Sequence, residues 1–167
     1  MGIACQPTVE YWVFIYYCAK LLDFGDTIFI VLGKKTRQLS VLHLWHHAST
    51  LALFGFYLSA GIAGGSIAML PLLNSLTHVV MYSHYLACSI FKIKHAWWKP
   101  GVTALQMGHH VVLMVYMVLN TIYGGSEFSV GVCIAGLLWG CSILGLFARF
   151  YLQSYLSKGP VFKKARS

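Results

Sequence analysis

The chain has 167 residues, of which 58% are apolar and 10% are charged, and its mean hydropathy is +0.70. A soluble domain needs a more polar surface, so this composition indicates an integral membrane protein. The formal net charge of +8 does not indicate a nucleic-acid partner, because most Lys and Arg residues lie in short breaks between apolar runs; anionic lipid and a CoA-like anion are better partners.

Five apolar runs are each long enough to cross about 30 Å of hydrocarbon at about 1.5 Å per residue. They cover residues 9–32, 41–61, 66–90, 101–122 and 130–151. We therefore expect an all-α fold, a polytopic membrane helical bundle with five transmembrane helices. No repeat or interdomain linker interrupts residues 1–156, which we interpret as one membrane domain, followed by a basic tail at 157–167. The five cysteines contain no CxxC motif and do not suggest a disulfide framework.

The basic residues predict the orientation of the bundle. All of the 12 Lys and Arg residues except Lys20 and Arg149 lie in the first break, the third break or the tail. With five crossings these three segments share one face of the membrane. The positive-inside rule then places that face, and with it the C-terminus, in the cytosol.

The first run contains Lys20, Asp23, Asp26 and Thr27 well inside an apolar helix. Lys20 and Asp23 are three residues apart and can neutralise each other. Two interpretations are open: a structural ion pair that locks helices together, or groups that hold histidines or a polar ligand.

The second run begins with His43, His46 and His47, whose side chains fall within roughly a 100° arc of a helix. Ionisable groups in a membrane helix are costly and usually point into the bundle or a wet cavity, so three imidazoles on one face suggest a functional site. The alternative is a set of interfacial histidines bonded to neighbouring helices.

The third run carries a polar and aromatic stripe formed by Asn74, His78, Met81 and Tyr85, within about 60° of one another, with Tyr82 beside it. Aromatic and Met spacing alone is ordinary core packing, whereas Asn and His on the same stripe favour a site. His84 points elsewhere on this helix.

The fourth run places Thr103, Gln106, His109 and His110 within about a 120° arc, where they could donate hydrogen bonds to a carbonyl or a phosphate. Interhelical hydrogen bonds are the alternative, which we favour for this run taken alone. In the fifth run Gly136-xxx-Gly140 predicts close helix packing and no further role.

Four motifs in this order resemble those of the fatty acid elongase (ELO) family, over about residues 19 to 121. They are Lys20-x-x-Asp23-x-x-Asp26-Thr27, His43-x-x-His46-His47, Asn74-x-x-x-His78-x-x-Met81-Tyr82-x-x-Tyr85 and Thr103-x-x-Gln106. The chain departs from the family pattern at three positions: Asp23 replaces the more frequent Glu, His84 the usual Tyr, and His109 the usual Gln. The resemblance also implies that the first two spans of the family are missing from this chain.

The resemblance implies a helical barrel around a closed acyl tunnel in the endoplasmic reticulum membrane. The family condenses a long-chain acyl-CoA with malonyl-CoA to give 3-oxoacyl-CoA, CO2 and CoA, the reaction of a very-long-chain 3-oxoacyl-CoA synthase. We expect these substrates and membrane lipid as partners, no metal or other cofactor, and other elongation-cycle enzymes or further copies of the chain as additional partners.

The residues suggest how such a condensation could proceed. A neutral histidine nitrogen can attack a thioester, and the acyl-imidazole that forms reacts further. Our hypothesis is that His46 accepts the acyl group, His47 or His43 orients or deprotonates it, and His78 transfers protons. We expect the remaining site residues to bind substrate: Lys20, Asp23, Asp26, Asn74, Tyr82, Tyr85, Gln106 and His109.

Two other functions are compatible with the sequence. A di-iron membrane desaturase or hydroxylase also uses His-x-x-His-His boxes, and imidazole suits iron; against it, the histidine-rich stretches lie inside spans and no second such box occurs. A non-catalytic lipid-binding membrane protein is the other alternative.

Overall fold

The computed structural model describes residues 6–34, 39–93, 96–123 and 129–156, and the regular structure in these ranges is helical throughout. The helices are α1 (Gln6–Leu32), α2 (Val41–Ser59), α3 (Met69–Ile90), α4 (Lys99–Tyr123) and α5 (Val130–Tyr151). A short 3-10 helix, η2 (Gly65–Ala68), precedes α3, and a π-helical turn, η3 (Leu152–Leu156), continues α5. The predicted fold class is confirmed, with each expected segment matched to within a few residues.

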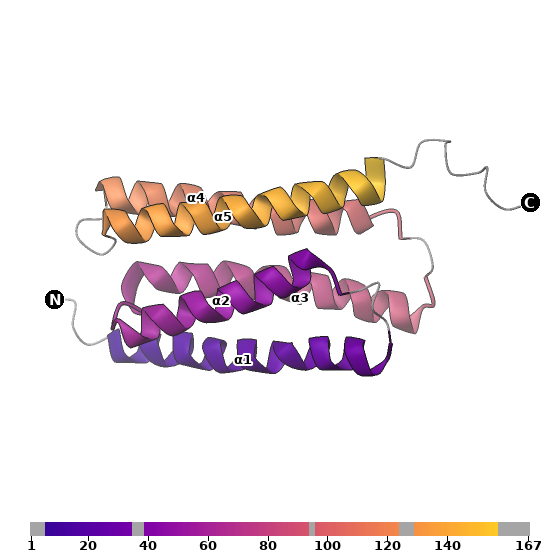
Figure 1. Cartoon of the computed structure of the whole chain (residues 1–167), viewed down its shortest axis with the longest axis horizontal. Coiled ribbons are helices and arrows are strands. Elements are labelled where there is room, and N and C mark those ends of the chain that lie inside the picture. Colours follow the sequence, from indigo (N-terminus) through magenta and orange to yellow (C-terminus); the bar gives the residue numbers. More distant parts are fainter. Residues whose placement is uncertain (1–5, 35–38, 94–95, 124–128, 157–167) are drawn as a thin grey trace, which may run out of the picture.

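The helices lie side by side along the long axis of the molecule (Figure 1). The contacting neighbours are α1 with α2, α2 with α5, α5 with α4, and α4 with α3. The two ends of this series, α1 and α3, both contact η2. The five helices therefore form a ring that is incomplete on one side. At that side α1 and α3, the two end helices, face each other.

Serine caps set where two of the helices begin. Ser40 accepts a hydrogen bond from the backbone N–H of His43 at 3.1 Å, and Ser129 accepts one from Val132 at 3.2 Å. Such caps satisfy donors that have no partner in the first turn of a helix. The cap at Ser40 fixes the first turn of α2, which contains the first of the three clustered histidines.

The apolar core occupies the half of the bundle next to η2. It includes Val13 of α1, Tyr57 of α2 and Leu70 of α3, together with Met117 of α4 and Cys133 of α5, all buried. The polar motifs lie in the other half: they follow the core residues on α1 and α3 and precede them on α2 and α4. The bundle is thus divided along its length into an apolar half and a half that contains the candidate site.

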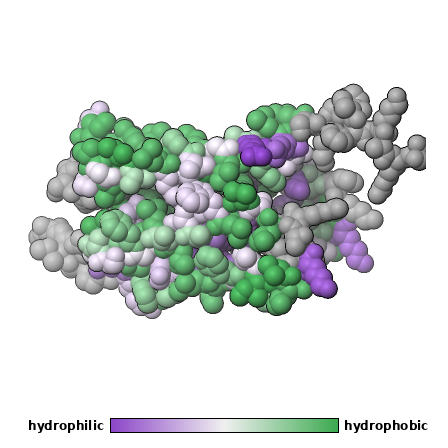
Figure 2. Space-filling view, viewed as in Figure 1, coloured by the Kyte–Doolittle hydropathy of each residue, from purple (hydrophilic) through white to green (hydrophobic). Residues whose placement is uncertain are grey.

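The outer surface suits a lipid environment. Large apolar side chains are exposed on every long helix, and Figure 2 shows apolar residues over much of one face, with hydrophilic residues gathered toward the right-hand end. By length and composition α4 and the continuous helix Val130–Leu156 could each cross a membrane. The other three helices carry most of the ionisable and amide residues of the candidate site, which lower their mean hydropathy.

Two helices end in the same way at the more hydrophilic end. Lys34 follows α1 with φ 54° and Lys92 follows α3 with φ 53°, both in the left-handed region where helices often stop. Lys99, at the start of α4, lies at this same end (Figure 1). The described lysines of the two breaks therefore gather at one end, as the sequence predicts; Lys35, Arg37, Lys94 and the tail at 157–167 lie outside the described residues.

Small residues allow α4 and α5 to approach closely, as predicted from Gly136-xxx-Gly140. Both glycines are buried. A Cβ added at Gly140 would lie 2.9 Å from Cγ of Met114, whereas one added at Gly145 would meet nothing within 4 Å. A side chain at position 140 would therefore force Met114 to move.

Replacing Gly140 with Ala should lower the stability of the bundle by about 1–3 kcal/mol, because the methyl group overpacks the contact with Met114. Thermal unfolding in detergent, followed by circular dichroism, measures the change. Gly145→Ala on the same helix is the matched control and should be neutral or stabilising, since Ala favours the helix. Equal stability of the two variants would contradict the packing role.

Candidate active site

Five imidazole rings from three helices form a cluster centred on His46. The ring centres of His46 and His47 are 5.6 Å apart, and those of His43 and His47 are 4.4 Å apart. His78 of α3 lies 6.3 Å from His46, nearly parallel to it at 24°, and His110 of α4 lies 6.0 Å away. The structure thus brings together the four histidines that the sequence proposes as catalytic and adds one from α4.

Helix α1 contacts this histidine cluster through one polar and one aromatic side chain. Thr27 Oγ1 and His43 Nε2 are 2.9 Å apart, within hydrogen-bond distance. The ring of Phe24 lies edge-on to that of His47, with 6.3 Å between centres. These contacts link the second half of α1 to the first two turns of α2.

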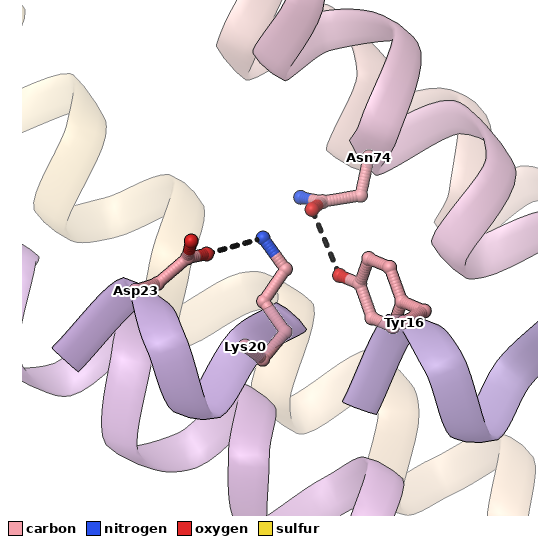
Figure 3. Close-up of polar contacts among 4 residues, drawn as sticks. All are labelled: Tyr16, Lys20, Asp23 and Asn74. Carbon is pink, nitrogen blue, oxygen red and sulfur yellow. Dashed lines mark hydrogen bonds and ion pairs between the residues drawn. The ribbon is translucent and has the colours of Figure 1, made fainter. Parts of the chain in front are cut away.

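An ion pair within α1 lies beside a hydrogen bond that joins α1 to α3 (Figure 3). Lys20 Nζ donates to Asp23 Oδ2 at 2.8 Å, and both side chains are largely buried, with 8% and 20% exposed. Tyr16 donates its hydroxyl to Asn74 Oδ1 at 2.8 Å, and Lys20 Nζ lies 5.0 Å from the centre of the Tyr16 ring. The predicted pairing of Lys20 and Asp23 is confirmed. The side chain of Asp26 lies outside the described residues.

An open pocket of about 630 Å³ separates α1 from α3. From α1 it is lined by Tyr16, Ala19, Lys20 and Asp23, and from α3 by Ser75, His78, Val79, Tyr82, Ser83 and Leu86. This volume is within the range of pockets that hold small-molecule ligands. A ligand in it would lie against His78, the ring that stacks on His46.

The remaining predicted substrate-binding residues are spread around this region. Tyr82 lines the pocket and is 42% exposed, whereas Tyr85 is 53% exposed and its ring is 5.5 Å from that of His84. Gln106 donates to Met81 Sδ at 2.9 Å. His109 is buried and lies against His110, with 3.9 Å between ring centres. The structure therefore places Tyr82 at the pocket and Gln106 and His109 on the α4 side, behind α3.

Two residues at the site were not assigned a role from the sequence. Tyr16 precedes Lys20 by four residues and Asp23 by seven, so helical periodicity places it on the same stripe and could have identified it. Trp139 of α5 donates to Ser49 Oγ at 2.8 Å and packs 5.8 Å from the ring of His110. No sequence spacing indicated that contact, because it joins two helices far apart in the chain.

His84 belongs to a separate structural contact, as its predicted position on the helix indicates. It is buried, and its Nδ1 accepts a hydrogen bond from Trp98 Nε1 at 2.8 Å. Across the described ranges, no group of three or more His, Cys, Asp and Glu side chains is placed to hold a metal ion.

Comparison with known proteins agrees with this arrangement of motifs. The sequence model of the ELO family, described as the GNS1/SUR4 family, matches residues 2–163. The chain belongs to the ELO family. The membership confirms the resemblance drawn from the four motifs, and the family match also covers α5, which none of the motifs reaches.

Similar ELO proteins are found in protists and mammals. The chain is 35% identical over 158 residues to fatty acid elongase 4 of Trypanosoma brucei brucei, covering 95% of this chain and 61% of that protein. It is 37% identical over 151 residues to very long chain fatty acid elongase 2 of Mus musculus, covering 89% of this chain and 50% of that protein. The chain therefore spans between half and about three fifths of the length of these relatives. No solved structure matches it.

The ion pair between Lys20 and Asp23 can be tested by a double replacement. Asp23→Ala should destabilise the ELO bundle by about 2 kcal/mol, because it leaves the buried ammonium group of Lys20 without its partner. Lys20→Met combined with Asp23→Ala removes both charges and should recover part of the loss. Unfolding in detergent gives both values. A double variant no more stable than Asp23→Ala would show that the unpaired charge is not the cause.

Proposed function

We propose that this ELO chain carries out the condensing step of fatty acid elongation, as a very-long-chain 3-oxoacyl-CoA synthase. A long-chain acyl-CoA and malonyl-CoA would give 3-oxoacyl-CoA, CO2 and CoA. The observation that carries this proposal is the approach of His46 and His78, from different helices, beside a pocket of ligand size. The relatives named as fatty acid elongases support the same chemistry.

In the first step, Nε2 of His46 attacks the carbonyl carbon of the acyl thioester. The carbon–nitrogen bond forms, the carbon–sulfur bond breaks, and CoA leaves as a thiolate that takes a proton from solution. Histidine suits this role because its neutral nitrogen is nucleophilic near neutral pH and the acyl-imidazole is readily cleaved. His43 and His47 flank the nucleophile on α2 and would help to orient it.

In the second step, loss of CO2 from malonyl-CoA gives an enolate that attacks the acyl carbon. The new carbon–carbon bond forms as the bond to His46 breaks, and 3-oxoacyl-CoA is released. His78 would hold or move a proton near this carbon, which its position 6.3 Å from the His46 ring supports. The Tyr16 hydroxyl fixes the amide of Asn74 by donating to its Oδ1, so the NH2 group can donate to an oxyanion. Gln106 is a second candidate donor.

The charges of the bundle suggest where the substrates bind. Lys34, Lys92 and Lys99 lie at one end, where they would attract the CoA phosphates. Lys20, Asp23 and Tyr82 line the pocket and would contact the polar part of the substrate. We place the chain in the endoplasmic reticulum membrane as a multi-pass protein with its basic end and C-terminus in the cytosol. Other elongation-cycle enzymes and further copies of the chain are the expected partners.

The covalent step can be tested by incubating the purified membrane protein with a long-chain acyl-CoA alone. Mass spectrometry of the digested protein should find one acyl group on the peptide that contains His46, because acylation does not require malonyl-CoA. His46→Ala should remove the adduct. His84→Ala is the matched control on a buried histidine outside the cluster and should retain it.

Adding malonyl-CoA to the acylated protein should release 3-oxoacyl-CoA. A preparation that incorporates labelled malonyl-CoA but forms no adduct would contradict the covalent step. A folded protein that binds acyl-CoA without any incorporation would instead support the non-catalytic alternative. Two irons per chain in the purified protein would support the desaturase or hydroxylase.

A further inference from the structure

His110 of α4 is buried, with 2% of its surface exposed, whereas the other four histidines of the cluster are half-buried. Its ring centre lies 6.0 Å from that of His46 and 5.8 Å from those of Trp139 and Phe147. None of the elongase motifs recognised in the sequence includes this position. The sequence offered His110 only as a hydrogen-bond donor to a ligand, so this buried imidazole next to the proposed nucleophile has no assigned role in the chemistry.

The backbone fixes which nitrogen of His110 carries its proton. Nδ1 lies 2.8 Å from the carbonyl oxygen of Gln106, one turn earlier on α4. A carbonyl oxygen can only accept, so Nδ1 must be the donor, and in the neutral ring Nε2 then carries the lone pair. Within the described residues this Nε2 is buried and has no hydrogen-bond partner. His110 Nε2 is therefore a buried hydrogen-bond acceptor without a donor.

His46 has the complementary group. Its Nδ1 is also buried and has no hydrogen-bond partner in the described part of the chain. If Nε2 of His46 attacks the thioester, Nδ1 must carry the proton, which makes it a donor without an acceptor. Buried polar groups are normally satisfied, so two unpaired and complementary atoms on rings 6.0 Å apart require an explanation. With the ring centres 6.0 Å apart and the planes at 73°, rotation of the His46 ring or one bridging water would pair these atoms while His110 keeps its bond to Gln106.

We propose that His110 is a positioning residue and proton acceptor for His46, an inference that rests on the proposed function. Its Nε2 holds His46 as the Nδ1–H tautomer and so directs the lone pair of His46 Nε2 at the acyl carbon. When the carbon–nitrogen bond forms, the Nδ1 proton of His46 passes to His110 Nε2, which leaves a neutral acyl-imidazole. When the enolate derived from malonyl-CoA displaces His46 from the acyl group, the proton returns from His110 Nε2 to His46 Nδ1. The number of protons on the two rings together is unchanged over the cycle.

This assignment adds His110 to the residues that orient His46, a role that the sequence gave to His47 or His43. His43 has its Nε2 within hydrogen-bond distance of Thr27. His110 combines a tautomer fixed by the backbone with an unpaired acceptor beside His46.

The test compares two replacements of His110 with a matched control. His110→Phe keeps a planar ring but removes the acceptor, and His110→Gln keeps an acceptor on a side chain of similar reach. His84→Phe removes a buried imidazole from α3 outside the cluster. The rate of single-turnover acylation of His46 by acyl-CoA should fall about 10²-fold in His110→Phe. The steady-state KM for acyl-CoA should change little. His110→Gln should recover at least about tenfold of that loss, and His84→Phe should react at the unaltered rate.

A second measurement does not depend on activity. Nitrogen-15 NMR of labelled histidines should find His46 as the Nδ1–H tautomer in the unaltered protein and in His110→Gln, and should find that preference lost in His110→Phe. An unaltered protein with this tautomer but no acyl adduct would contradict the proposed function and leave the pairing of the two rings supported.

Several results would overturn the pairing itself. They are an unchanged His46 tautomer in His110→Phe, acylation by His110→Phe at the unaltered rate, and equal slowing by Phe and Gln at position 110. Slowing of the same size in His84→Phe would also overturn it, because loss of any buried imidazole would then suffice. Circular dichroism and size-exclusion chromatography of each variant confirm that the compared proteins are folded.

Discussion

The hydrogen bond from Tyr16 to Asn74 is the contact on which the geometry of the site depends. It joins α1 and α3, the two ends of the helix series, across the place where the series would otherwise be open. One turn beyond it on each helix lie Lys20 and His78, on opposite sides of the pocket. The bond is directional, so it fixes how the Tyr16 turn of α1 faces the Asn74 turn of α3. Its position therefore sets the distance across which a ligand is held.

The division of the bundle into an apolar half and a polar half explains how the chain can contain so many ionisable groups. Close packing of apolar side chains around Tyr57 and Met117 stabilises the end near η2. The opposite half holds the ion pair, the histidine cluster and unpaired nitrogens, which are costly where water is excluded. Packing in one half thus offsets the free-energy cost of the polar groups in the other. The candidate site can therefore contain groups that lower the stability of the bundle.

Most of the fold and part of the site can be predicted from the sequence. Apolar runs locate the helices because each must cover the same thickness of hydrocarbon, and helical periodicity places His43, His46 and His47 on one face. The order of neighbours cannot be read in this way, because periodicity says which residues share a face and not which helix that face meets. The contact of His110 with His46, and that of Trp139 with Ser49, depend on α4 and α5 packing beside α2. The tautomer of His110 depends on a backbone carbonyl, for which the sequence gives no signal.

The ends of α1 and α3 show a conflict between backbone geometry and charge. Lys34 and Lys92 both adopt positive φ angles, a conformation that costs an ordinary L-residue roughly 1–2 kcal/mol and costs glycine almost nothing. A glycine at either position would relax the turn, and it would also delete a cation from the end of the molecule where the described lysines gather. Selection for a tighter fold and selection for a more attractive electric field would therefore favour opposite residues at the same two positions.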